Sequence, residues 1–115
     1  MPNLGDIIEL TVDISERNLC AGMQGTIVHS HSERVYEVEF SNTEGETLEL
    51  LALGLEQFIV VWQAETQEWI SAEQQAIELI SRLPHDAAKE VLDFARFLSF
   101  RRGKRVNDKT VYINE

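Results

Sequence analysis

Two histidines separated by one residue are the first candidates for chemistry in this sequence. His29 and His31 share one face of an extended strand if the segment is a strand, because successive side chains alternate between the two faces. Two imidazoles placed in this way can share a metal ion. The third histidine, His85, is distant in the sequence, and no cysteine or carboxylate stands at a recognised ligand spacing. We therefore expect the pair to belong to a polar hairpin end, and we expect no metal and no cofactor.

Catalytic groups are equally sparse. Glu37 and Glu39 share one face of a predicted strand, as an acid–base pair could. That face is opposite the apolar side chains of the same strand, so it reads as the solvated face. Cys20 lacks a recognisable base and orienting group, and no glycine-rich phosphate loop is present. The sequence therefore predicts that the protein is not an enzyme.

Charge and hydropathy narrow the possible partners and the compartment. The 115 residues include 20 acidic and 10 basic side chains, and the net charge of −10 argues against a general nucleic-acid-binding role. The longest apolar runs, 50–53 and 58–62, are too short to span a membrane. The first residues do not resemble a secretory signal, and the single cysteine fits a reducing compartment. We therefore expect a cytoplasmic protein.

The charge and the periodicity both change near residue 63, which predicts two modules. Residues 1–63 carry eleven acids and two bases, a net of −9, whereas the remaining residues carry nine acids and eight bases, a net of −1. Period-two patterns predict five short strands in residues 1–63, and a small SH3-like antiparallel barrel is the economical way to close them. Its expected core consists of Ile8, Leu10, Val12, Ile27, Tyr36, Val38, Phe40, Leu48 and Leu50.

The second module, residues 64–103, is predicted to be a two-helix hairpin. Ser71 and Gln74 form a capping-box pattern, and Pro84 separates two amphipathic stretches. Gly103 is a stop signal, and residues 104–115 form a short polar tail. The segment 63–68 is the expected linker. The predicted fold class is therefore α+β.

The second helix has aromatic residues outside its main apolar stripe. Phe97 and Phe100 lie among charged residues on the helical wheel, which favours contact with a partner. The only basic cluster follows them and can supply a polar rim. The predicted partner-binding residues are Phe97, Phe100, Arg101, Arg102, Lys104, Arg105 and Tyr112.

A hairpin of two short helices leaves one side of each helix uncovered, so we also expect a homodimer. A four-helix bundle of two copies would cover the apolar stripes. The residues expected in that interface are Ile77, Ile80, Val91, Phe94 and Leu98.

Two stretches of the chain resemble bacterial protein families. Residues 5–62 resemble an uncharacterised SH3-like family found near toxin–antitoxin genes, through the segments Gly22-Met-Gln-Gly-Thr-Ile-Val28, Tyr36-Glu-Val-Glu-Phe40 and Gly45-Glu-Thr47. Residues 71–102 resemble a short helical antitoxin-like family, through Leu83-Pro84 and the later Glu90-Val-Leu-Asp-Phe94 and Phe97-Leu98. This resemblance implies a protein partner of the small ribonuclease-toxin type. No familiar DNA-binding module of an antitoxin is recognisable.

The leading functional prediction is a non-catalytic, antitoxin-like protein that binds and neutralises a small basic toxin through its helical half. An acidic protein suits a cationic partner, because opposite charge speeds the encounter. The alternative is an SH3-like adaptor or assembly module that binds a protein partner with no toxin involved. A nucleic-acid-binding regulator that uses the basic helix end is a third class, and the acidic composition disfavours it.

Overall fold

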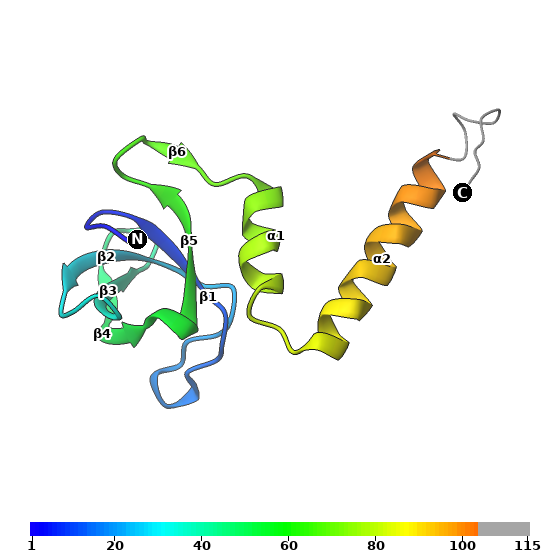
Figure 1. The fold of residues 1–115 in the computed structure, drawn as a ribbon. Coiled ribbons are helices and arrows are strands. Elements are labelled where there is room, and N and C mark those ends of the chain that lie inside the picture. The colour runs from blue at the N-terminus through cyan, green and yellow to red at the C-terminus, as the bar shows by residue number, and fades with distance from the viewer. Residues whose placement is uncertain (104–115) are drawn as a thin grey trace. The chain divides into compact units, whose positions relative to one another are not determined.

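The computed structural model describes residues 1–103, and it divides the chain into two compact units. The first unit is Met1–Glu78, and the second begins at Leu79. Figure 1 shows the strands at the start of the chain and the two helices that follow them. The predicted tail, with the predicted partner residues Lys104, Arg105 and Tyr112, lies outside the described residues.

Six strands of the first unit form one antiparallel sheet, in the order β4-β3-β2-β1-β5-β6. The strands are β1 (Ile7–Leu10), β2 (Gln24–Ser30), β3 (Val35–Ser41), β4 (Thr47–Gly54), β5 (Phe58–Gln63) and β6 (Glu68–Trp69). Short 3-10 helices occupy Ser15–Arg17 and Leu55–Gln57. With the two helices described below, the sheet confirms the α+β class.

The strand count and the closure of the sheet differ from the prediction. Five strands were predicted, and the sixth, β6, lies partly in the segment predicted as a linker. Trp69 of β6 pairs with Trp62 of β5, and the two ring centroids are 6.4 Å apart. A two-residue strand is too short to produce a period-two pattern, so the sequence did not reveal it. The sheet is not closed, because β4 and β6 are its two edges.

The core of the first unit contains most of the residues predicted to line it. Ile8, Leu10, Ile27, Tyr36, Val38 and Phe40 are all at most 2% exposed. Further buried side chains come from the loop after β1 and from the later strands: Ile14, Leu19, Leu53, Phe58, Ile59 and Val61. The buried Tyr36 hydroxyl donates a hydrogen bond of 3.0 Å to the Glu33 carbonyl oxygen, which satisfies its polar group.

Three predicted core residues are exposed instead. Val12 is 39% exposed because β1 ends at Leu10, before the predicted alternation ends. Leu48 and Leu50 are 55% and 51% exposed. In β4 the residues opposite the buried Val38 and Tyr36 are Leu51 and Leu53, so the prediction assigned the wrong face of β4 to the core.

Gly25 of β2 packs against β3 too closely for any side chain. A Cβ atom at this position would be 2.7 Å from Val38 Cγ1 and 3.0 Å from the Glu39 carbonyl oxygen. We expect Gly25→Ala to lower the free energy of unfolding by about 1–3 kcal/mol, because the added methyl group overpacks the core. Urea denaturation measures this loss. The neighbouring exposed residue supplies the control, and Gln24→Ala should change stability by less than about 0.5 kcal/mol. A Gly25→Ala variant as stable as this control would contradict the packing described here.

Two helices follow the sheet, α1 (Ala72–Ile80) and α2 (His85–Gly103). Their boundaries agree with the predicted signals. Ser71 Oγ accepts a hydrogen bond of 3.1 Å from the Gln74 backbone N–H, which caps the start of α1. The Pro84 carbonyl oxygen accepts a hydrogen bond of 2.9 Å from the Ala88 N–H and so begins the bonding pattern of α2. Neither described helix is both long and apolar enough to cross a membrane.

Candidate protein-binding surfaces

The outward side of β3 and β4 combines exposed leucines with carboxylates. Leu50 lies directly opposite Glu39, and Ala52 lies opposite Glu37. Leu48 lies at the irregularity where the register of the two strands shifts, and both leucines are about half exposed. We call Glu37, Glu39, Leu48, Leu50 and Ala52 the β3–β4 outer face.

Polar contacts hold the carboxylates of this face in place. Thr47 donates its hydroxyl hydrogen bond to a carboxylate oxygen of Glu39. Glu37 Oε1 is 2.6 Å from His31 Nε2. The two glutamates therefore lie beside the leucines, and each has a polar contact that restrains its side chain, which lowers the entropy cost of using it in binding.

The histidine pair lies beside this face. His29 pairs with Glu37 in the register of β2 and β3, and its ring contacts that of His31 edge to face, with centroids 4.9 Å apart. Within residues 1–103, no three side chains of the metal-binding types gather into one group. Cys20 is exposed, and its backbone N–H is 3.1 Å from the Met23 sulfur.

Strand β4 is also an edge of the sheet, with β3 as its neighbour. Exposed apolar side chains on an edge strand promote association with other chains, and proteins usually avoid this combination. The exposed Leu48 and Leu50 therefore make β4 and its outer face a candidate binding surface.

Residues 4–60 match the model of the family described as "Domain of unknown function (DUF4926)". The matched segment runs from the residues before β1 into β5. It therefore contains the whole β3–β4 outer face, whereas α1 and α2 lie beyond the DUF4926 match. The comparisons with curated proteins and with solved structures give no match.

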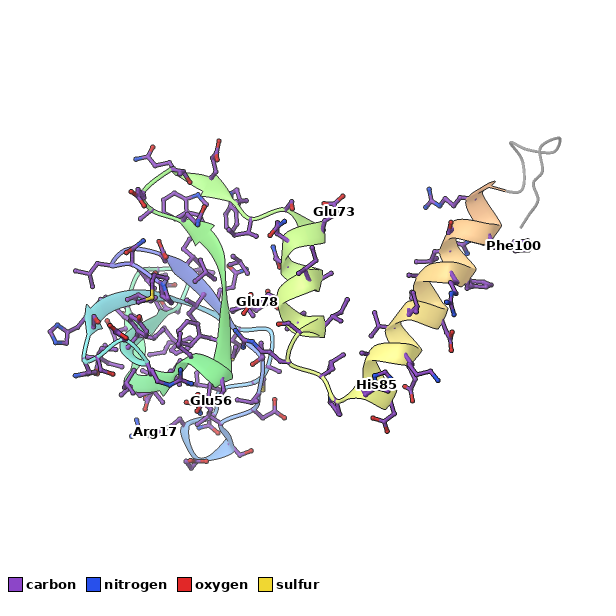
Figure 2. The ribbon with its side chains drawn as sticks, viewed as in Figure 1. Arg17, Glu56, Glu73, Glu78, His85 and Phe100 are labelled. Carbon is purple, nitrogen blue, oxygen red and sulfur yellow. The ribbon has the colours of Figure 1, made fainter. Side chains whose placement is uncertain are left out.

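The predicted partner residues of the second unit lie in the C-terminal part of α2. Phe97 is 54% exposed and Phe100 is 71% exposed. Phe97 stacks on Phe94, with ring centroids 6.2 Å apart, and the Arg101 guanidinium lies 5.5 Å from the centroid of the Phe97 ring. Arg102 is exposed in the last turn of α2. Figure 2 labels His85 and Phe100 near the two ends of this helix.

The sequence does not show which leucines of β4 belong to the β3–β4 outer face. In the stretch Leu48-Glu-Leu-Leu-Ala-Leu53, apolar residues fall on both faces of the strand, so alternation alone does not identify the inner face. Glu49 is the register partner of the buried Phe40, so it lies on the same face of the sheet. It also forms an ion pair with Arg17. The one available signal is the pair of glutamates on the predicted solvated face of β3, which lies beside whichever leucines face outward.

Proposed function

We propose that this chain is a non-catalytic, antitoxin-like protein that binds and neutralises a small basic protein. The observation that carries the proposal is the β3–β4 outer face, which joins half-exposed leucines to carboxylates on an edge strand. Leucines that leave water on binding supply affinity, and the neighbouring carboxylates select a cationic partner.

The charge of the strand-forming segment supports a basic partner. Residues 1–63 carry a net charge of −9, from eleven acids and two bases. Arg17, one of these two bases, is already paired with Glu49. A field of this sign attracts a cationic protein over a distance of about 10 Å at moderate salt.

The sign of the charge favours a binding site for this partner on the sheet, not on the helical half. The C-terminal half of α2 contains Arg96, Arg101 and Arg102, which repel a basic partner. The first unit has a net charge of the opposite sign, and it has an apolar patch of its own. We therefore assign the basic partner to the β3–β4 outer face, and we leave the aromatic residues of α2 to another contact.

A second candidate function is an adaptor or assembly module, in which the first unit binds a protein partner with no toxin involved. The edge position of β4 favours this reading, because an extended segment of a partner can add to an edge strand through its backbone. Such a partner would need no positive charge, so the salt dependence of binding separates the two functions.

The first test uses the small basic protein whose gene the antitoxin hypothesis predicts beside the gene of this protein. We expect the double variant Leu48→Ser/Leu50→Ser to weaken binding by at least about 30-fold, on the scale of interface hot spots. Isothermal titration calorimetry at two salt concentrations measures the affinity and its dependence on charge. Co-expression with growth as the readout measures neutralisation.

Val12→Ser provides the matched control, because Val12 is also exposed but lies outside the β3–β4 outer face. The control should bind like the wild type. Equal loss of affinity in the control, or full affinity in the double variant, would remove the outer face from the proposal. Salt-independent binding of a neutral protein at this face would favour the adaptor.

A further inference from the structure

Four residues of α2 form a stripe with a symmetrical order of chemistry. Glu90, Phe94, Phe97 and Arg101 are separated by four, three and four residues, a spacing that places side chains on one face of a helix. Phe94 is 61% exposed and Phe97 is 54% exposed. Glu90 and Arg101 are exposed at the two ends. We call these four residues the α2 stripe.

Read from either end, the α2 stripe runs from a charge through two aromatic rings to the opposite charge. A stripe of this kind is complementary to itself when two copies lie antiparallel. Glu90 of one copy then meets Arg101 of the other, and Phe94 meets Phe97. We propose that the α2 stripe is a homodimer interface in which the α2 helices of two copies pack antiparallel about a two-fold axis.

The contacts within one copy prepare the stripe for this role. The rings of Phe94 and Phe97 are already stacked, 25° from parallel, so they present a single apolar ridge. The Arg101 guanidinium lies over the Phe97 ring, which holds its charge at the end of that ridge. Little side-chain freedom remains to be lost when the second copy binds.

The charges along the whole helix select the antiparallel direction. The N-terminal half of α2 carries Asp86, Glu90 and Asp93 against Lys89, a net of −2, and the C-terminal half carries three arginines, a net of +3. Antiparallel helices place unlike halves side by side, and they also align the helix dipoles favourably. Parallel helices would place like charges together at both ends of the stripe, which is unfavourable.

The size of the stripe suits a helix pair. Its first and last residues are eleven steps apart along the helix, or about 16 Å at about 1.5 Å per residue. Packed helices lie about 8–10 Å apart, a separation that rings as large as phenylalanine can fill. This interface includes Phe94 but does not require Ile77 or Ile80 of α1, which the sequence-based bundle required.

Charge reversal in α2 provides the test, with oligomeric state measured by sedimentation equilibrium on the full chain. The wild type should be dimeric at micromolar concentration. Glu90→Lys and Arg101→Glu should each raise the dimer dissociation constant at least about tenfold, because each creates like-charge contacts twice in the symmetric dimer. The double variant Glu90→Lys/Arg101→Glu should restore the wild-type value, and a mixture of the two single variants should form heterodimers.

Lys89→Glu is the matched control, since Lys89 is exposed on α2 but lies away from the stripe, and it should dimerise like the wild type. Far-UV circular dichroism checks that each variant keeps its helices. If one single variant loses its helices, the dissociation constant of the other single variant provides the test.

A monomeric wild type at tens of micromolar would overturn the proposal and leave α2 to another occupant, such as the first unit of its own chain. Single variants with wild-type affinity, or a double variant that stays weakened, would also overturn the antiparallel pairing. Because this interface lies outside the β3–β4 outer face, its failure leaves the proposed function standing.

Discussion

Replacing Leu53 with alanine is expected to lower the free energy of unfolding by about 2–5 kcal/mol, whereas the same change at Leu50 should cost less than about 1 kcal/mol. The two leucines are three residues apart on β4, but Leu53 is 1% exposed and Leu50 is 51% exposed. Truncation of Leu53 removes buried methyl groups and leaves a cavity beside Tyr36, its partner in the register. Truncation of Leu50 removes groups that are already half in water.

Urea denaturation followed by tryptophan fluorescence measures both changes. The predicted difference inverts the expectation from the sequence, in which Leu50 was a core residue. If Leu50→Ala were as damaging as Leu53→Ala, the face of β4 in the structure would be wrong, and the β3–β4 outer face would lose its leucines. The comparison therefore tests the fold and the candidate site together.

The strands of the first unit were predictable where one face is strictly apolar. In β3, glutamates separate Tyr36, Val38 and Phe40 from one another, and all three are buried as predicted. In β4, leucines fall on both faces of the strand, so the pattern is satisfied whichever face is buried. The structure resolves this ambiguity through the pairing of Leu51 with Val38, a long-range contact that local periodicity does not contain.

The helices were predictable because their ends carry local signals. Ser71 and Pro84 act through atoms within four residues of themselves, so the sequence alone is sufficient to place the starts of α1 and α2. The surface that each helix uses is a different question. Phe97 was predicted from its position outside the main stripe, but its stacking on Phe94 and its contact with Arg101 appear only in three dimensions.

The distribution of charge links the two candidate surfaces. The first unit is strongly acidic, and α2 changes from acidic to basic along its length. A cationic partner therefore has its favourable surface on the sheet, and a second copy of the chain has its favourable surface on α2. A dimer through the α2 stripe would carry two β3–β4 outer faces, so we expect one partner molecule for each copy of the chain where both proposals hold.

The second large effect is expected at Asp6, the buried charged residue of the first unit. Asp6 is 1% exposed, and its carboxylate accepts hydrogen bonds of 2.9 Å from the backbone N–H groups of Asn3 and Ala64. The bond from Ala64 joins the chain after β5 to the chain before β1, 58 residues away in the sequence. Asp6→Ala would leave both donors without their acceptor, and we expect it to lower the free energy of unfolding by about 3 kcal/mol.

Asp6→Asn should fall between the wild type and Asp6→Ala, because an amide keeps one acceptor oxygen where the carboxylate has two. Asp13→Ala is the matched control, since Asp13 also accepts a backbone hydrogen bond, 2.8 Å from the Ala21 N–H, but is exposed. Water can replace the lost acceptor at Ala21, so this change should cost less than about 1.5 kcal/mol. Urea denaturation of all three variants gives the comparison. If Asp6→Ala lowered the free energy of unfolding no more than Asp13→Ala, the hydrogen bonds of the Asp6 carboxylate would not be what stabilises the contact between the chain before β1 and the chain after β5.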